Sequence, residues 1–273
     1  MESRGRTNSA GLDESARAGE LVVVGTGIKL VVQTTPEALD CITRADKLLY
    51  LVTDPATETW LHRLNAAAES LIDCYAPGKP RERSYREMVQ RMLTAVRTGA
   101  KVCAAFYGHP GVFVNPGHEA VSRARREGFR ARMLPGISTE DCLFADLGID
   151  PADHGCQSFE ATDFLAYRRR FDPTSALILW QVGVLGEPGF PTEAGCRPER
   201  LARLTRVLRR HYDERHPIIL YEAAQFPVSE PKIKKIPLSK LPSVRLWSIT
   251  TLYIPPKPAR APDPAVMRWF DEE

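Results

Sequence analysis

Two tyrosines and three basic side chains stand close together between positions 75 and 85. These residues, Tyr75, Lys79, Arg81, Arg83 and Tyr85, surround a Pro/Gly turn. A guanidinium stays protonated and favours the phenolate form of a neighbouring phenol. Such a pair can take a proton from a weakly acidic group. The spacing alone also suits exposed loop residues, so both interpretations stay open at this point.

A second candidate site is the string YGHPGVF at positions 107–113, which directly follows the apolar run VCAAF. Two glycines and a proline favour an irregular loop with exposed backbone N–H and C=O groups. A plain turn rarely needs Tyr, His and Phe beside such glycines. We therefore expect a ligand site that uses Tyr107, His109, Val112 and Phe113.

Two further glycine turns follow apolar runs. The GTG turn at 25–27 is not a dinucleotide fingerprint, because position 30 is leucine and no acidic residue ends the next expected strand. The PG turn at 135–136 precedes Ser138 and Thr139, whose hydroxyls would stand beside free N–H groups at a helix start. Each turn is also compatible with a simple strand-to-helix connection.

These loops need strands and helices that position them. Apolar runs predict strands at 21–24, 47–52, 102–107 and 129–134. Capping signals and helical spacing predict helices from Thr35, from Asp54 to about Ala68, from a capping box at Ser84–Glu87, over 116–127 and from Ser138. The alternation predicts an α/β fold with a largely parallel sheet, in which ligands gather at the carboxyl ends of strands.

The second half of the sequence predicts fewer helices and strands. Strands are expected at 176–182, 218–223 and 244–254, with a helix at 199–211 and a Pro/Gly-rich stretch at 186–198. We expect a disordered leader at 1–19, an N-terminal α/β lobe at 20–134, a C-terminal α/β lobe at 135–256 and a tail at 257–273.

Composition excludes several classes of protein. The 273 residues are 43% hydrophobic and 26% charged, which excludes disordered and fibrous chains. A net charge of +3 is too mild to indicate a nucleic acid or an anionic membrane as partner. The polar N-terminus has no signal-peptide core, and no apolar run reaches the roughly 18–20 residues of a membrane helix. We expect a soluble, cytoplasmic protein.

The cysteines and histidines do not predict a metal site. The six cysteines show no CxxC spacing, and the six histidines form no HExxH pair. Isolated cysteines in apolar surroundings are typical of reduced core residues.

Taken together, these strings resemble the tetrapyrrole (corrin/porphyrin) methylase superfamily over residues 20–256. Its members are two-lobed, class III S-adenosylmethionine (SAM) methyltransferases with the cofactor in the cleft between lobes. The string from YGHPGVFVNPGHEAVSRARREGF to FADLGIDP is similar to the borosin peptide backbone N-methyltransferases, and ALILWQVG, ILYEAAQFP and ITTLYIPP follow in the same order. Borosin enzymes methylate main-chain amide nitrogens of a ribosomally made precursor peptide.

The resemblance implies site residues. Matching positions of the catalytic cluster are Tyr75, Arg81, Tyr85 and Tyr107. Matching SAM contacts are Tyr107, His109, Val112, Phe113, Ser138, Thr139, Gln181, Ala223, Thr250 and Thr251. Where the family often has a further aromatic upstream of the first tyrosine, this chain has Ile72 or Asp73. Positions 139 and 250 carry Thr where relatives have Ala and Ser.

Backbone N-methylation suggests roles for the cluster. An amide N–H is a far weaker acid than a phenol, and its nitrogen lone pair is delocalised into the carbonyl. We expect Tyr85, made more acidic by Arg81, to take the proton, and Arg81 or Tyr75 to donate to the developing oxyanion. Tyr107 would position the peptide or the methyl group.

The resemblance also implies partners. The chain is closest in organisation to the split bacterial type, with its precursor supplied in trans, and a homodimer or a heterotetramer with the precursor is expected. Three alternatives remain: a tetrapyrrole or other small-molecule methyltransferase, an inactive binding or scaffold member, and an RNA methyltransferase. The last would be expected to carry a stronger basic excess than +3.

Overall fold

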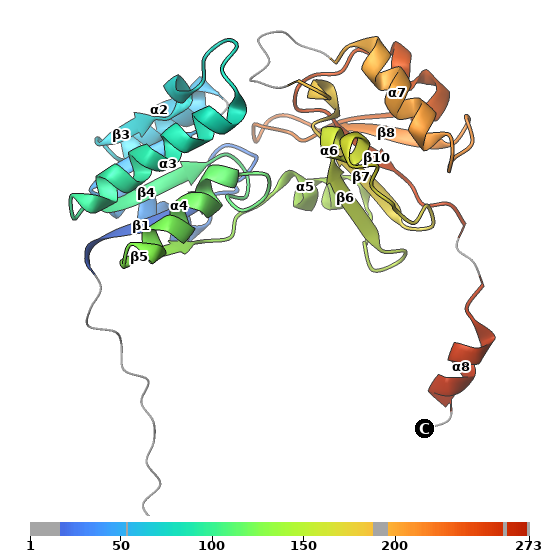
Figure 1. Cartoon of the computed structure of the whole chain (residues 1–273), viewed down its shortest axis with the longest axis horizontal. Coiled ribbons are helices and arrows are strands. Elements are labelled where there is room, and N and C mark those ends of the chain that lie inside the picture. Colours follow the sequence, from blue (N-terminus) through green and yellow to red (C-terminus); the bar gives the residue numbers. More distant parts are fainter. Residues whose placement is uncertain (1–16, 53, 188–195, 259–260, 272–273) are drawn as a thin grey trace, which may run out of the picture. The chain divides into compact units, whose positions relative to one another are not determined.

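The computed structural model describes residues 17–52, 54–187, 196–258 and 261–271 (Figure 1). The chain forms two compact units, each with a five-stranded sheet. The first unit holds the described residues up to Cys74 together with Glu82–Ile137, and the second holds Tyr75–Arg81 and the described residues from Ser138 onward. Most of the expected leader, residues 1–16, lies outside the described residues, whereas 17–19 belong to a strand and correct its end.

The sheet of the first unit is parallel throughout. Its order is β3-β2-β4-β1-β5, with β1 (Arg17–Gly25), β2 (Lys47–Leu51), β3 (Ala68–Ser70), β4 (Lys101–Phe106) and β5 (Phe129–Met133). The helices are α1 (Pro36–Arg44), α2 (Pro55–Leu64), α3 (Arg81–Arg97) and α4 (Asn115–Arg126), with a short turn η1 (Ile72–Cys74). Helices α1 and α2 pack on one face of the sheet, and α3 and α4 cover the other (Figure 1).

Local chemistry explains where these helices begin and end. The Thr35 hydroxyl accepts a hydrogen bond from the Ala38 N–H at 3.2 Å, as expected for an N-cap. Helix α2 ends before Asn65, whose side-chain amide donates to the carbonyl oxygens of Ile42 and Ala45 at the end of α1. The expectation of a helix to about Ala68 is therefore wrong, and Ala68 opens strand β3 instead.

The capping box expected at Ser84 is also wrong. Helix α3 begins at Arg81, so Ser84 lies inside the helix and faces the core. Its side chain is fully buried, and its hydroxyl has no hydrogen-bond partner among the described residues. The S-x-x-E spacing occurs here without the extended backbone that a cap requires.

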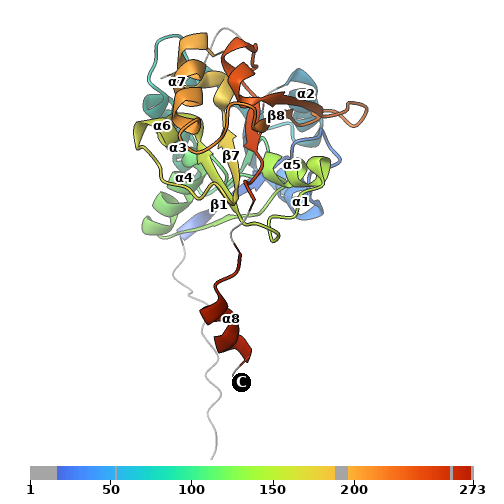
Figure 2. The same ribbon diagram turned by 90° about the vertical axis from the view of Figure 1, so that its right-hand side faces the viewer.

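The second unit has a mixed sheet with order β6-β7-β10-β8-β9, of which Figure 2 labels β7 and β8. Its strands are β6 (Cys156–Glu160), β7 (Ala176–Trp180), β8 (Pro217–Glu222), β9 (Lys232–Pro237) and β10 (Thr251–Ile254). The helices are α5 (Thr139–Leu147), α6 (Ala161–Ala166), α7 (Pro198–Leu208) and α8 (Pro264–Asp271), with turns η2 (Val182–Val184) and η3 (Leu238–Ser243). Leucines of α7 pack against β7 and β10 in the core.

Only one pair in this sheet, β6 with β7, is parallel. The expectation of a largely parallel sheet, drawn from the first half of the sequence, is thus confirmed in the first unit, whereas the sheet of the second unit is mixed. The strand expected at 244–254 is confirmed only from Thr251, because the preceding residues form turns. The Pro/Gly-rich stretch at 186–198 falls mostly on residues 188–195, outside the described part of the chain.

All six cysteines are free thiols. Cys74, Cys103 and Cys142 are buried, as expected, whereas Cys41, Cys156 and Cys196 are only half-buried. Cys156 begins an outer strand of its sheet, which leaves it partly open to solvent. Burial nevertheless raises the pKa of its thiol to about 11, so this thiol is protonated at neutral pH.

Across the described residues, no helix combines the length and the apolar character needed to cross a membrane.

Candidate functional site

Three glycine turns meet at the carboxyl edge of the first unit's sheet. Gly27 and Gly108 exchange backbone hydrogen bonds of 3.3 and 2.9 Å. A Cβ built on Gly25 would lie 2.1 Å from the Gly108 carbonyl oxygen, and one on Gly136 would lie 3.2 Å from it. The loops after β1, β4 and β5 therefore touch through their backbones, which only residues without side chains permit. We call this contact of Gly25, Gly27, Gly108 and Gly136 the glycine junction.

The turn after β1 is closed by a side chain. The Gln33 carbonyl oxygen Oε1 accepts hydrogen bonds from the Ile28 and Lys29 N–H groups at 2.9 and 2.8 Å. These two N–H groups already donate within the protein, so they are not available to bind a phosphate. This agrees with the absence of a dinucleotide fingerprint at 25–27.

The loop that follows β4 carries two of the expected side chains, both half-buried. Tyr107 directly follows the strand, and its N–H donates to the Leu51 carbonyl of the neighbouring strand at 3.1 Å. His109 accepts a hydrogen bond from the Gly111 N–H at its Nδ1 atom, at 2.9 Å. Both residues are thus fixed at the carboxyl edge of the first sheet.

The same loop ends in an exposed apolar pair, Val112 and Phe113, which are 36% and 48% exposed. Phe113 has φ 56°, a left-handed backbone conformation that is uncommon for an aromatic residue. Strained backbone of this kind clusters at ligand sites because the surrounding structure must hold it in place. The exposure and the strain together support a ligand contact here.

The second unit gathers the remaining expected residues from its strands at one edge. Gln181 follows β7 and Ala223 follows β8, whereas Thr250 and Thr251 stand at the start of β10. Because β10 runs antiparallel to both β7 and β8, its start lies beside their ends. The sheet therefore brings these four residues together.

Thr250 is held by the protein itself. Its side chain is 1% exposed, its hydroxyl donates to Glu222 Oε1 at 2.7 Å, and it accepts from the Trp247 N–H at 2.9 Å. Thr250 thus shapes this edge by fixing the turn before β10. A ligand contact through its hydroxyl would have to displace one of these bonds.

Gln181 has the opposite character. It is half-buried, has φ 57°, and its side-chain amide makes no hydrogen bond within the described part of the chain. The next turn is tightly packed, since a Cβ on Gly183 would lie 1.7 Å from the Trp247 carbonyl oxygen. A strained backbone and an amide with open hydrogen-bonding capacity make Gln181 the best-supported ligand residue in this unit.

Ser138 and Thr139 begin α5, as expected from the sequence. The Ser138 hydroxyl donates to Asp141 Oδ2 at 2.7 Å and accepts from the Asp141 N–H at 3.2 Å, so the capping box is confirmed. Ser138 is buried and its donor is already used. Thr139 is the first helical residue and remains half-buried.

The four expected catalytic residues are all half-buried. Tyr75 and Arg81 group with the second unit, and Tyr85 and Tyr107 with the first. Arg81 and Tyr85 both lie on α3, four residues apart, so they share one side of that helix. This spacing is consistent with the pairing of guanidinium and phenol expected from the sequence.

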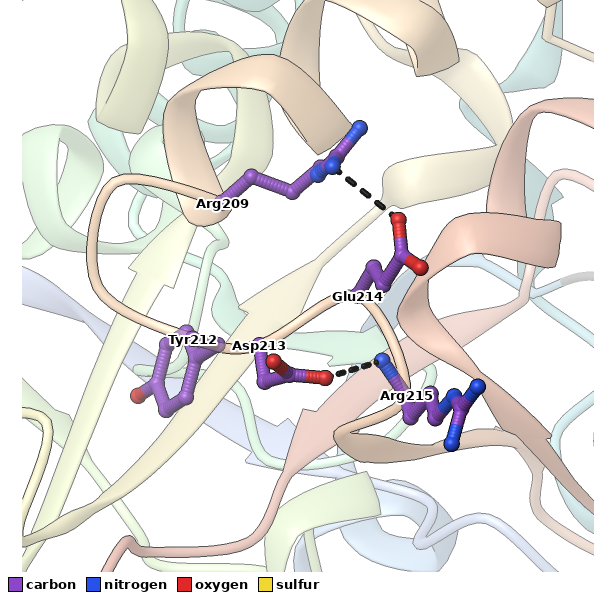
Figure 3. Close-up of a pocket in the computed structure, with 5 residues that line it drawn as sticks. All are labelled: Arg209, Tyr212, Asp213, Glu214 and Arg215. Atoms are coloured by element: carbon purple, nitrogen blue, oxygen red, sulfur yellow. Dashed lines mark hydrogen bonds and ion pairs between the residues drawn. The ribbon is translucent and has the colours of Figure 1, made fainter.

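A separate hollow of about 510 Å³ lies after α7 and contains none of the expected residues (Figure 3). It is lined by Arg209, Tyr212, Asp213, Glu214 and Arg215. Arg209 pairs with Glu214 at 3.1 Å, and both side chains are 53% exposed. Asp213 accepts from the Arg215 backbone N–H at 2.8 Å, which closes a turn. These contacts indicate a solvated surface turn.

In the ranges that the structure describes, no cluster of three or more His, Cys, Asp or Glu side chains could hold a metal ion.

The chain is similar to fungal proteins that join a methyltransferase to a peptide precursor. It is 44% identical over 256 residues to a methyltransferase/ribosomally synthesized cyclic peptide gymnopeptides precursor of Gymnopus fusipes, covering 92% of this chain and 61% of that protein. The corresponding omphalotin A precursor of Omphalotus olearius is 43% identical with the same coverage. A type I borosin cyclic peptide precursor of Coprinopsis marcescibilis is 41% identical, covering 88% of this chain and 63% of that protein.

The chain thus spans about three fifths of the length of these curated relatives. Their names confirm the resemblance to borosin proteins that the sequence strings predicted. They describe methyltransferase and precursor in one protein, which differs from the expected split organisation.

Solved structures and a family model identify the fold. A uroporphyrin-III-C-methyltransferase from Thermus thermophilus matches with a TM-score of 0.62 at 19% identity, covering 88% of this chain and 93% of that one. A structure of diphthine synthase matches with a TM-score of 0.59 at 15% identity, covering 88% and 91%. These likenesses confirm the expected class III methyltransferase fold. Since the model of the Tetrapyrrole (Corrin/Porphyrin) Methylases matches residues 20–239, the chain belongs to that family.

Proposed function

We propose that this protein is a SAM-dependent methyltransferase that N-methylates backbone amides of a ribosomally made precursor peptide, acting on several amides in turn. The observation that carries the proposal is the similarity of 41–44% to proteins named as methyltransferases and cyclic peptide precursors. Membership of a methylase family supports the reaction type. The family model alone would equally suit a tetrapyrrole substrate, so the peptide substrate depends on these relatives.

The residues proposed to bind SAM have suitable chemistry within each unit. Val112 and Phe113 offer exposed apolar surface to a ring, and Gln181 offers an amide with open donors and acceptors. Tyr107, His109, Ser138, Thr139, Ala223, Thr250 and Thr251 complete the proposed binding set. When bound, SAM supplies an electrophilic methyl group and leaves as S-adenosylhomocysteine.

The chain's own residues then have distinct tasks. Tyr85 takes the proton from the amide nitrogen through its phenolate oxygen, which Arg81 on the same helix stabilises. Arg81 or Tyr75 donates a hydrogen bond to the amide oxygen, where negative charge develops. Tyr107 orients the peptide, so that the amide nitrogen stands in line for transfer.

The test is co-expression of the chain with a candidate precursor peptide, followed by intact and tandem mass spectrometry. Mass gains in whole CH2 steps on backbone nitrogens are the expected result. Tyr85→Phe should remove most turnover and keep SAM binding, whereas the control Tyr167→Phe, a tyrosine 68% exposed on the second unit, should leave both unchanged.

Three results would overturn parts of this proposal. Full turnover in Tyr85→Phe would refute its role as base. Methylation only on side chains would refute backbone chemistry. SAM binding without peptide methylation, combined with methyl transfer to a tetrapyrrole, would replace the substrate class.

The precursor is proposed to act as a separate molecule and the enzyme as a homodimer, or as a heterotetramer with the precursor. Support comes from the resemblance to split borosin enzymes, whereas the fungal relatives carry methyltransferase and precursor in one protein. Light scattering of the purified chain with and without the peptide tests both points. A monomer that does not bind a separately added peptide would contradict them.

A further inference from the structure

One arginine on α3 holds the segment that leads into Tyr75. The Arg91 guanidinium donates through Nη1 to Asp73 Oδ1 and to Cys74 Sγ, the latter at 3.6 Å. Through Nη2 it donates to Glu69, which lies on β3. A single side chain thus contacts three residues of the stretch 69–74, and its planar fork fixes their geometry.

The stretch 69–74 is also bonded to the sheet, on the side away from α3. Glu69 pairs with Lys47 at the start of β2, and the pKa of its carboxyl is held below the ordinary value by hydrogen bonds from Lys47 and Arg91. Behind it, the Leu71 N–H donates to the Tyr50 carbonyl at 2.8 Å. The stretch 69–74 is therefore tied to the sheet on one side and to α3 on the other.

The loop that follows has both ends on one helix. Residues 75–80 begin next to Cys74, which Arg91 holds, and end where α3 begins at Arg81. Releasing the Arg91 contacts would remove the tie between the first end and α3 and leave the second end attached. The loop would then sample more conformations, and the position of Tyr75 would be less tightly fixed.

We propose that Arg91 is a positioning residue. By holding Asp73, Cys74 and Glu69 against α3, it fixes the loop that bears Tyr75 and leads into Arg81. This inference rests on the proposed function, in which Tyr75 and Arg81 act on the peptide amide. Arg91 acts through these residues and contacts no reacting atom.

The same helix supplies a matched control. Arg97 makes a two-pronged ion pair with Glu127, with Nε and Nη2 at 2.7 and 2.6 Å from the carboxylate oxygens. Its side chain is 38% exposed, against 29% for Arg91. Its ion pair with Glu127 lies outside residues 69–81, so Arg97 reports the effect of losing an arginine ion pair from α3 alone.

The experiment compares Arg91→Gln, Arg91→Lys and Arg97→Gln in the full chain. We expect Arg91→Gln to lower kcat about ten- to hundredfold, because small displacements of reacting groups are costly. Its SAM dissociation constant and melting temperature should match those of Arg97→Gln. Arg91→Lys keeps the charge without the fork and should recover part of kcat. Hydrogen–deuterium exchange should rise over 70–80 in Arg91→Gln and stay unchanged there in Arg97→Gln.

The hydrogen–deuterium exchange measurement tests the role of Arg91 independently of the proposed function. A wild-type chain without turnover would refute the proposed function, and exchange over 70–80 would still decide whether Arg91 clamps this segment. Equal kcat and equal exchange in Arg91→Gln and Arg97→Gln would overturn the inference. A lower kcat with unchanged exchange would also overturn it, because Arg91 would then act by another route.

Discussion

Replacing Gly25 by alanine tests whether the glycine junction holds the first unit's loops together. The new Cβ would lie 2.1 Å from the Gly108 carbonyl oxygen and 2.9 Å from Pro110 Cδ. The carbonyl belongs to the backbone and cannot rotate away independently. It is also fixed by the paired hydrogen bonds between Gly27 and Gly108. The loops after β1 and β4 must therefore separate.

The expected loss of stability follows from the hydrogen bonds that this separation breaks. Reaching an ordinary contact near 3.4 Å requires more than an ångström of backbone movement, which removes both Gly27–Gly108 hydrogen bonds. At about 1 kcal/mol each, these bonds account for about 2 kcal/mol. Overpacking adds about 1–3 kcal/mol. We expect Gly25→Ala to lower the free energy of unfolding of the first unit by about 3–5 kcal/mol.

The assay is urea unfolding followed by circular dichroism, with SAM binding measured in parallel. Gly99→Ala is the matched control, because Gly99 lies in the same unit, has φ +90° and a Cβ there comes no closer than 3.9 Å to a described atom, the Ala18 Cβ. It isolates backbone strain, at about 1–2 kcal/mol. A loss in Gly25→Ala no larger than in Gly99→Ala would refute the close backbone contact as a determinant of stability.

Three further substitutions test other contacts. Ser84→Ala should leave stability unchanged or raise it by up to about 1 kcal/mol in thermal unfolding, because it removes a buried hydroxyl without a partner among the described residues; a clear loss would indicate that the hydroxyl is satisfied. Tyr50→Phe should cost about 1–3 kcal/mol, since a buried hydroxyl that donates to Glu58 at 2.5 Å is lost; no change in urea midpoint would contradict this. Because the folded-state pKa of Glu69 is lowered, its stabilisation is present above about pH 4.3 and is lost as pH falls below it. The melting-temperature difference between wild type and Glu69→Gln should therefore shrink from pH 7 to pH 3, and a constant difference would contradict the ionic origin.

Much of the first unit could be predicted from local signals. Strands β1, β2 and β4 contain short apolar runs that are buried on both faces, and such runs are typical of parallel sheets. Thr35 caps its helix as its side chain predicts, and Ser138 does the same in the second unit. The false capping box at Ser84 shows the limit of this reasoning, because the same spacing occurs inside a helix whose start is set by the preceding prolyl turn.

The second unit was predicted less well, because its strands lack that signal. Strand β9 has the sequence KIKKIP and is almost wholly exposed, as suits an edge strand that carries lysines. The alternation of side chains over 244–254 predicts a strand, yet only Thr251–Ile254 form one, because Thr250 accepts from the Trp247 N–H and closes a turn. The Thr250 hydroxyl in turn donates to Glu222 at the end of β8, a contact that spacing does not reveal.

The placement of the candidate site residues in the fold was predictable where glycines and aromatics break the usual pattern of a turn. The loop at 107–113 and the residues at strand ends follow from the sequence and its resemblance. Gln33 and Arg91 had no such signal, because each acts through contacts with residues distant from any motif. Their tasks, closing a turn and clamping a segment, become visible only when the strands are placed.

Helix α8 affects how tryptophan fluorescence reports the unfolding of this protein. It buries none of its residues, and its Trp269 is 65% exposed, whereas Trp180 in β7 is 6% exposed. An indole in water emits at longer wavelength than one in an apolar core, so unfolding shifts the fluorescence of Trp180 and leaves that of Trp269 almost unchanged. Trp269 therefore adds a constant background to the emission spectrum. A Trp269→Phe variant removes this background, so that the emission reports Trp180 together with Trp247 and the half-buried Trp60 of the first unit.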